Sequence, residues 1–220
     1  MVAKITIPFI DKSFYKDSDI PLIKDKLTTI RQKYGTYINN ISKTTNIPKE
    51  LLISFLFVES GGNSKAKSPA NAIGLMQLKT GSASDILIME NKKNRLNEDE
   101  KIILRKYIGD RLDCILKAKF LGDKVLHQGE YKTVFITEED LYNPELSILI
   151  GAIYLGIVID EHIEKGQIRL DKVISRYNRG YFAKKGLVGT ISEVYENMPT
   201  ETKNYITKLS GKKGILDIII

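Results

Sequence analysis

Residues 46–62 read NIPKELLISFLFVESGG, a helix signal with clear ends and one residue that breaks its pattern. Pro48 suits the first turn of a helix, and Gly61-Gly62 favour a stop. Apolar residues at positions 51, 52, 55 and 58 recur at helical spacing. Glu59 follows Phe55 by four residues, so the helix places its carboxylate on the apolar side. The stretch therefore predicts a buried helix that ends in a carboxylic acid.

The position of Glu59 is expected to raise its pKa in two ways. Burial disfavours the charged carboxylate, and so does the negative end of the helix dipole in the last turn. A carboxylic acid that stays protonated near neutral pH is suited to act as a general acid. The alternative is an ordinary helix-end glutamate that is paired with a nearby Lys or Arg, or is simply exposed.

A loop of small residues follows this helix. Residues 68–77 read SPANAIGLMQ, and such residues allow a backbone to approach a ligand closely. Gln77 offers both a hydrogen-bond donor and an acceptor for sugar hydroxyls and amides, and Met76 offers an adaptable apolar surface. The alternative is a surface loop whose Met76 is tucked into the core.

The rest of the chain is predicted to be all-α or nearly so. Helices are expected after Pro21, from Thr80, from the capping box Asn97–Glu100 to about Gly122, from Pro144 to Ile159, from Leu170 to Tyr177 and from Thr200 to Leu209. The run Tyr131–Ile136 is the one strand-like stretch, half of a small β-hairpin turning at Gly129. Thr137 with Asp140 suggests another helix cap.

Composition excludes several classes of protein. Hydrophobic residues make up 42% and charged residues 28%, which is typical of a soluble globular domain, and no apolar run is long enough to span a bilayer. The start, Met1–Ile10, does not have the pattern of a secretory signal. Cys114 is expected to be a small core residue, and His127 and His162 fit no metal-ligand pattern. We therefore expect neither a metal nor a cofactor.

Positive charge gathers toward the end of the chain. The net charge is +7, and residues 162–220 hold 11 Lys and Arg against six Asp and Glu. A basic surface favours an anionic partner such as nucleic acid, a membrane surface or an acidic wall polymer, although a solvated basic face is the simpler explanation. The aromatic interleaving of nucleic-acid binders is absent, so no nucleic acid is expected as a partner.

Three ordered motifs resemble those of the soluble lytic transglycosylases, relatives of goose-type lysozymes. They are Glu59-Ser60, Gly74-Leu75-Met76-Gln77 and Tyr177-Asn178-Arg179-Gly180. Asn143-Pro144 with Gly151 and Tyr154-Leu155 resembles the central helix of the family, and Pro199-Thr200-Glu201-Thr202 with Tyr205 and Lys208 resembles its closing motif. Each motif is weak alone, but their order makes chance a poor explanation. The resemblance implies a lysozyme-like fold.

The resemblance also divides the chain. It covers residues 20–210 and implies a catalytic domain there, while the residues outside it read as an extended lead-in over 1–19 and an apolar tail over 211–220. Between Gln77 and Asn143 lie 65 residues, far more than in the family, so residues 85–136 are interpreted as a mostly helical insertion. The insertion is expected to fold against the domain as a decoration, a wall of the glycan groove or a docking surface. Gly62, Asn71 and Arg176 depart from the residues usual at those positions.

The activity that the resemblance implies is cleavage of peptidoglycan. Glu59 would protonate the bond between N-acetylmuramic acid and N-acetylglucosamine and then act as base on the C6 hydroxyl, closing a 1,6-anhydro ring. Ser60, Met76, Gln77, Tyr177 and Asn178 would contact the glycan. A hydrolytic goose-type muramidase is the first alternative; it needs a second carboxylate, for which Asp85, Glu138 and Glu139 are candidates. A non-catalytic structural or binding protein on the same fold is the second.

Peptidoglycan glycan strands are the expected partner, and the bacterial cell wall the expected place of action. Without a leader of its own, the protein would be carried in a phage virion or delivered by a secretion system. The apolar tail, with Ile215, Leu216, Ile218, Ile219 and Ile220, is expected to fold back onto the domain, beside Ile5–Ile10. The alternative is that it docks on a virion protein or on a second copy.

Overall fold

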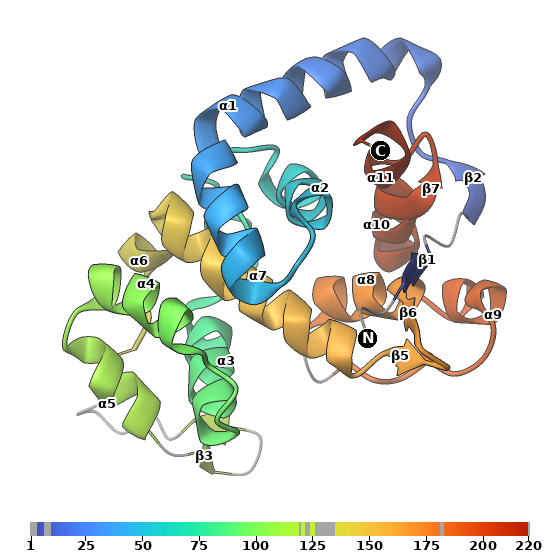
Figure 1. Ribbon diagram of the computed structural model, residues 1–220. Coiled ribbons are helices and arrows are strands. Elements are labelled where there is room, and N and C mark those ends of the chain that lie inside the picture. Colours follow the sequence, from blue (N-terminus) through green and yellow to red (C-terminus); the bar gives the residue numbers. More distant parts are fainter. Residues whose placement is uncertain are drawn as a thin grey trace. The chain divides into compact units, whose positions relative to one another are not determined.

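The computed structural model describes residues 4–6, 10–118, 120–121, 124–125, 135–180 and 183–219. It is mainly helical, as the sequence predicts (Figure 1). The helices are η1 (Asp17–Asp19), α1 (Ile20–Thr45), α2 (Lys49–Ser60), α3 (Thr80–Lys92), α4 (Glu98–Ile108), α5 (Arg111–Lys117), α6 (Glu138–Tyr142), α7 (Pro144–Asp160), α8 (Leu170–Arg179), α9 (Ile191–Glu196), α10 (Thr200–Ser210) and α11 (Ile215–Ile219). The strands are β1 (Lys4–Thr6), β2 (Ile10–Ser13), β3 (Phe120–Leu121), β4 (Lys124–Val125), β5 (Ile163–Glu164), β6 (Gln167–Arg169) and β7 (Gly211–Lys212).

The chain forms two units that interleave along the sequence. Unit 1 comprises Met1–Lys33, Ile47–Val58 and Tyr154–Ile220, and unit 2 comprises Tyr34–Asn46 and Glu59–Ile153. Because the boundaries fall inside α1, α2 and α7, each of these helices contributes to both units. α7 is apolar on every side and buried along nearly its whole length, which is the pattern of a central helix. No helix in the described ranges is long and apolar enough to cross a membrane.

Unit 2 is built from the second half of α1, the loop after α2, α3 to α6 and the first half of α7. Its helix caps follow the sequence: the side chain of Asn97 accepts from the backbone N–H of Glu100, and that of Thr137 from the N–H of Asp140. α5 packs against α3, and Figure 1 shows α4 and α5 beside it. Its buried apolar side chains include Ile38, Ile41, Ile73, Leu75, Leu87, Leu104, Leu112, Leu141 and Leu149.

Two expectations in the insertion were wrong. The single helix from Asn97 to Gly122 is two helices, because Gly109 adopts φ 60° and ψ −143° and breaks the helix between α4 and α5. Cys114 is exposed rather than in the core. α5 turns Leu112 and Ile115 inward, and one helical face cannot also bury the residue between them. The run Tyr131–Ile136 and its turn at Gly129 lie outside the described residues, except Phe135 and Ile136, which are buried.

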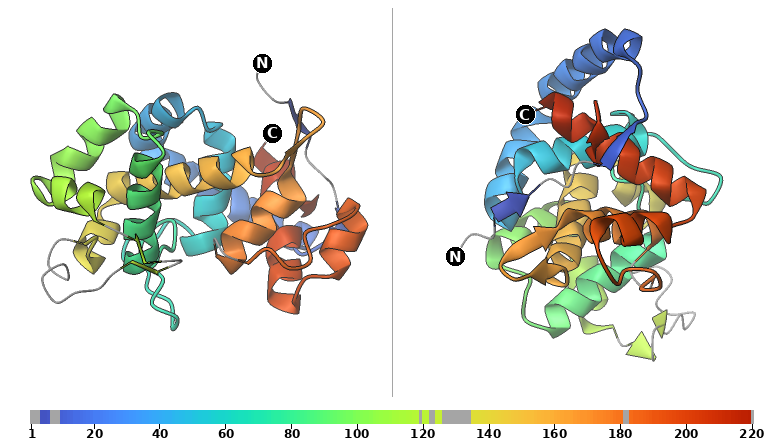
Figure 2. Two further views of the ribbon diagram at one scale, coloured as in Figure 1. Left: turned by 90° about the horizontal axis from the view of Figure 1, so that it is seen from below. Right: turned by 90° about the vertical axis from the view of Figure 1, so that its right-hand side faces the viewer.

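Unit 1 contains α2 up to Val58, α8, α10 and two small sheets. β6 pairs with β5 in an antiparallel hairpin and with β1 in parallel, and β2 pairs in parallel with β7 (Figure 2). The β5–β6 hairpin was not expected from the sequence. Its turn residues, Lys165 and Gly166, both have positive φ, as a tight two-residue hairpin turn requires. The Lys-Gly pair was the signal available for it.

The apolar tail folds back onto unit 1, as expected. Residues 215–219 form α11, which packs against α10, and Ile215 and Leu216 are buried. At the start of the tail, Gly211 lies so close to β2 that a Cβ there would stand 2.4 Å from the carbonyl oxygen of Lys12. The tail therefore begins at a strand pair, and its helix buries Ile215 and Leu216.

Deleting residues 214–220 is expected to lower the melting temperature by roughly 5–10 °C, which corresponds to about 2–3 kcal/mol for a chain of this size. Burial of the Ile215 and Leu216 side chains stabilises the fold by more than this amount, but the conformational entropy lost in ordering the segment offsets part of the gain. Thermal unfolding of the isolated protein measures the effect. As a control, Ile102→Ser alters a side chain that is 66% exposed and should leave the melting temperature within roughly 2 °C. An unchanged melting temperature on deletion would contradict the packing role.

Candidate active site

Glu59 lies in the last turn of α2 and is half-buried. The helix is buried through residues 51–56, whereas Lys49 at its start is exposed and its last residues, 57–60, are half-buried. Gly61 and Gly62, with φ of 59° and 82°, turn the chain away at that point. The position is the one that the apolar spacing predicts, whereas the expected rise in the pKa of Glu59 stays a prediction.

The residues after Glu59 are fixed by hydrogen bonds within unit 2. The hydroxyl of Tyr34 on α1 donates to the carbonyl oxygen of Gly62 over 3.1 Å, and the N–H of Gly62 donates to Oγ of Ser60 over 3.3 Å. Ser60 is half-buried at the helix end. Tyr34 is thus a positioning residue of this turn, and no motif pointed to it.

The loop from Asn63 to Lys79 is held by its own backbone. Ile73 pairs with both Lys67 and Leu78 in isolated bridges, and Asn71 adopts a left-handed φ of 58°, which asparagine tolerates. Gln77 also has positive φ, and its side-chain nitrogen Nε2 donates to the carbonyl oxygen of Gly74 over 3.0 Å. The side chain of Gln77 is therefore held against the loop with its carbonyl oxygen as the remaining polar atom.

Gly74 is the residue that this loop needs as glycine. Its φ is +75°, and a Cβ would stand 2.0 Å from the carbonyl oxygen of Leu141 on α6 and 3.0 Å from Oγ of Ser147 on α7. Ser147 also accepts a hydrogen bond from the N–H of Met76 over 3.3 Å. The Gly74–Gln77 motif is thus pressed directly onto α6 and α7.

The structure places Met76 in the core. Its side chain is completely buried, and a Cβ on Gly151 of α7 would stand 2.6 to 2.8 Å from its side-chain atoms. This is the alternative that the sequence left open for Met76, and it also explains why the central helix carries glycine at 151. A glycan contact by Met76 stays a prediction.

Described residues of the insertion are locked to the helices beneath this loop. Arg111 on α5 donates two hydrogen bonds to Asp140 on α6, of 2.7 and 2.9 Å, and a third to the carbonyl of Phe135. Burial acts to raise the pKa of Asp140, but the bonds from Arg111 and Thr137 outweigh it and hold that pKa below its ordinary value. Lys106 and Tyr107 both contact the buried carboxylate of Glu145 on α7. The described helices of the insertion, α4 and α5, therefore fold against α6 and α7, as expected.

The three carboxylates considered for a hydrolase lie in different surroundings. Glu138 is exposed and forms an ion pair of 2.8 Å with Lys67, Glu139 is exposed, and Asp85 is half-buried on α3. Within the described ranges, no group of three His, Cys, Asp or Glu is arranged to hold a metal ion. His127 lies outside those ranges, and His162 is buried, where burial lowers its pKa.

Tyr177 and Asn178 belong to unit 1, at the end of α8. The ring of Tyr177 is buried, edge-on to Phe55 with centroids 4.8 Å apart, and 4.9 Å from the ring of Tyr154. The side-chain oxygen of Asn178 accepts from the hydroxyl of Thr202 over 2.8 Å. Thr202 comes from the closing motif, to which the sequence assigned no role, and the structure shows that it orients Asn178.

Arg176, the departure from the family pattern, is a buried structural residue. Its guanidinium lies 3.0 Å from the carboxylate of Glu161, and its carbonyl accepts from the hydroxyl of Tyr154. The buried charge of Arg176 is thus paired with Glu161, which lies just after α7. Its neighbour in sequence, Tyr177, keeps the aromatic packing described above.

Comparison with known proteins gives a consistent result. Residues 36–102 match the family described as transglycosylase SLT domain. Membrane-bound lytic murein transglycosylase E of Buchnera aphidicola subsp. Acyrthosiphon pisum is 44% identical over 93 residues, covering 39% of this chain and 42% of that protein. Membrane-bound lytic murein transglycosylase C of Glaesserella parasuis serovar 5 is 26% identical over 181 residues, covering 81% of this chain and 37% of that protein. Membrane-bound lytic murein transglycosylase E of Buchnera aphidicola subsp. Baizongia pistaciae is 30% identical over 146 residues, covering 65% of this chain and 50% of that protein. The matched region thus spans half or less of each relative.

Proposed function

We propose that this chain, a relative of the lytic murein transglycosylases whose residues 36–102 match the transglycosylase SLT domain, cleaves peptidoglycan without water. The observation that carries the proposal is Glu59, a half-buried acid at a glycine-terminated helix end, followed by a rigid Gly74–Gln77 loop in the same unit. The bond cleaved is the β-1,4 link from N-acetylmuramic acid to N-acetylglucosamine.

One carboxylate suffices for this reaction. Glu59 gives its proton to the glycosidic oxygen as the bond to C1 of the muramic residue breaks. The acetamido group of that residue stabilises the positive centre. The Glu59 carboxylate then removes the proton of the C6 hydroxyl, and O6 bonds to C1 to close the 1,6-anhydro ring. The proton taken from O6 restores Glu59, so no water is consumed.

The remaining site residues would hold the glycan. Ser60 and the side-chain oxygen of Gln77 lie in the same unit as Glu59 and offer polar atoms for sugar hydroxyls and amides. Asn178 is held by Thr202, and its amide nitrogen would donate to the substrate. Tyr177 would act through its hydroxyl, while its buried ring supports the end of α8. For Met76 a supporting role under the loop fits its burial better than direct contact.

Digestion of purified sacculi is expected to release muropeptides with 1,6-anhydromuramic ends. Mass spectrometry separates the two enzyme classes, because an anhydro end is lighter than a reducing end by one water. A hydrolytic muramidase would need Asp85, Glu138 or Glu139 to position water, and Glu138 is engaged by Lys67. Finding reducing ends alone would move the protein to that class, and finding no cleavage would favour a non-catalytic binding role.

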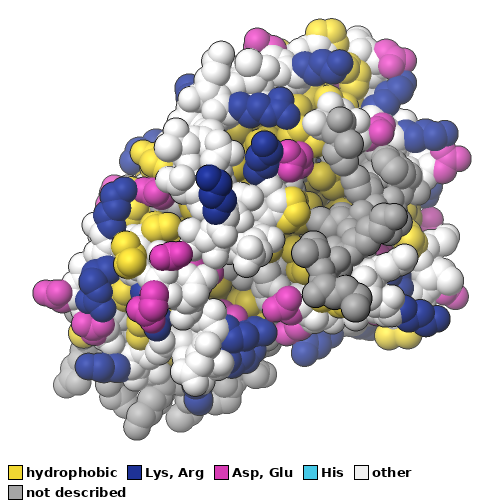
Figure 3. Space-filling model, in the orientation of Figure 1, with side chains coloured by type: hydrophobic (Ala, Val, Ile, Leu, Met, Phe, Trp, Pro, Cys, Tyr) yellow, Lys and Arg dark blue, Asp and Glu magenta, His cyan; other side chains and the backbone are white. Residues whose placement is uncertain are grey.

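The place of action follows from the substrate. A peptidoglycan-cleaving enzyme works at the bacterial cell wall, and transport there in a phage virion or through a secretion system stays a prediction. On the face drawn in Figure 3, Lys and Arg side chains are mixed with Asp and Glu side chains rather than gathered into one large basic field. That distribution fits a solvated surface better than a nucleic-acid interface.

A further inference from the structure

A loop held by arginine side chains follows the Tyr177–Gly180 motif in unit 1. The loop, Ala183–Thr190, is held at two of its backbone carbonyls by arginine side chains. Arg179 donates to the carbonyl of Lys185 over 2.8 Å, and Arg169 donates to the carbonyl of Gly189 over 3.0 Å. The first arginine comes from the motif itself and the second from the end of β6.

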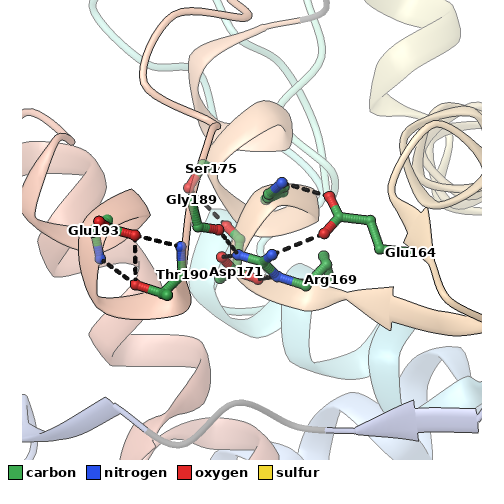
Figure 4. A network of polar contacts seen from close by, with 8 residues as sticks. Glu164, Arg169, Asp171, Ser175, Gly189, Thr190 and Glu193 are labelled. Carbon is green, nitrogen blue, oxygen red and sulfur yellow. Dashed lines mark hydrogen bonds and ion pairs between the residues drawn. The ribbon is translucent and has the colours of Figure 1, made fainter.

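Arg169 is fixed by an ion-pair network behind the loop. Its side chain is only 18% exposed, and the guanidinium makes two hydrogen bonds of 2.8 and 2.9 Å to Asp171, whose side chain is 1% exposed, and a third to Glu164. The hydrogen bond from Lys172 to Glu164 and the charges of Lys172 and Arg169 hold the pKa of Glu164 below its ordinary value. Figure 4 shows Arg169 between these acids, with Gly189 beside it.

The backbone of the loop is also sterically defined. Gly186 has φ 83°, and a Cβ there would stand 2.8 Å from the methyl group of Met198. Thr190 and Glu193 form a capping box that starts α9 where the loop ends. Leu187 is buried between the two clamped carbonyls. A loop held in this way loses little conformational entropy when it binds a ligand.

The clamped loop presents two cations and one aliphatic side chain to solvent. Lys184 and Lys185 are exposed, and Val188 is 84% exposed. Within the described part of the chain, no carboxylate lies at ion-pair distance from either lysine, whereas the neighbouring Arg169, Lys172 and Lys203 are all paired with acids. The fold thus stabilises a loop whose two exposed lysines, Lys184 and Lys185, can bind an anionic ligand.

We propose that Lys184, Lys185 and Val188 form a subsite for the stem peptides of peptidoglycan, with Arg169 as its positioning residue. The inference rests on the proposed function. In an intact strand the lactyl groups of the glycan are amide-linked to the peptides, so the carboxylates that two lysines would recognise lie on the peptides. The alanine methyl groups of those peptides suit an exposed valine. The subsite would therefore make binding depend on whether the glycan carries peptide.

The test compares two substrates with one pair of variants. Lys184→Gln/Lys185→Gln is expected to raise KM for peptide-bearing glycan strands roughly three- to ten-fold with kcat unchanged, as loss of two exposed ion pairs would. For strands stripped of peptide by an amidase, with the freed lactyl carboxylates converted to methylamides, KM should stay within about twofold. The control Lys24→Gln/Lys165→Gln removes the same charge from exposed lysines of unit 1 outside the loop, and should change KM for neither substrate.

The outcomes separate the two proposals. If the wild-type protein cleaves neither substrate, the proposed function fails. If it cleaves both, and the loop variant is unchanged on both, equally impaired on both, or matched by the control, the subsite is wrong. Arg169→Lys tests the positioning role: a folded variant should show the same peptide-dependent rise in KM, and an equal loss on both substrates would show that Arg169 only stabilises the fold.

Discussion

Glu59→Gln is expected to lower the rate of wall cleavage by at least about 10³-fold, because one group supplies both the acid and the base of the reaction. Glutamine keeps the shape of the side chain but can neither donate nor accept the proton. Since Glu59 is half-buried at the end of α2, the neutral amide should be accommodated, and the melting temperature should stay within roughly 2 °C. Clearing of purified sacculi gives the rate, and thermal unfolding gives the stability.

Glu50→Gln is the matched control for this variant. Glu50 lies in the first turn of the same helix, and Lys49 is 3.9 Å from its carboxylate. The same carboxyl-to-amide change there should leave the clearing rate within about twofold, since exposed pairs of this kind contribute little. Near wild-type clearing by Glu59→Gln would disprove the assignment, and an equal loss in both variants would point to a general effect of the substitution on α2 rather than to catalysis.

Gly74→Ala should lower the free energy of unfolding by about 3–5 kcal/mol, combining a left-handed backbone with a forced contact. The added Cβ would stand 2.0 Å from the carbonyl oxygen of Leu141, a backbone atom that cannot rotate away. Either the loop moves off α6, which displaces Gln77, or α6 shifts away from the loop. Chemical denaturation measures the stability, and the clearing assay should show a loss of activity in whatever protein remains folded.

Gly35→Ala is the control for this second prediction. Gly35 lies in the interior of α1, and nothing comes within 4 Å of a Cβ built there. Alanine should therefore stabilise the protein by about 0.5–1 kcal/mol, since glycine is the poorer helix former. Equal and small effects at both glycines would contradict the close approach of the loop to Leu141.

Much of the fold is readable from local sequence signals. Helical spacing and caps predicted the major helices, and the capping boxes at Asn97 and Thr137 are present. The same signal at Thr190 and Glu193 marks α9 and went unused. The break at Gly109 was missed because the apolar spacing continues from Leu104 to Ile115, and both helices bury their part of it. Periodicity reports which side is buried, not whether the backbone is continuous.

The site was predictable as far as it depends on one helix or one turn. The place of Glu59 follows from its spacing to Phe55, and the turn after it follows from Gly61-Gly62. What the sequence could not supply were contacts between distant segments: Tyr34 on Gly62, Thr202 on Asn178 and the carbonyl of Leu141 over Gly74. Each depends on which residues tertiary packing brings together, and no local pattern encodes that.

The interleaving of the two units has a consequence for synthesis on the ribosome. Unit 2 is complete once residue 153 has been made, whereas unit 1 needs both ends of the chain, because Ile10 pairs with Gly211 and Ile5 with Ile168. Such contacts have high contact order and form late. The nascent chain is therefore expected to hold Glu59 and the Gly74–Gln77 loop in a folded unit while Tyr177 and Asn178 are still being added. Unit 1 would be the last part of the chain to fold.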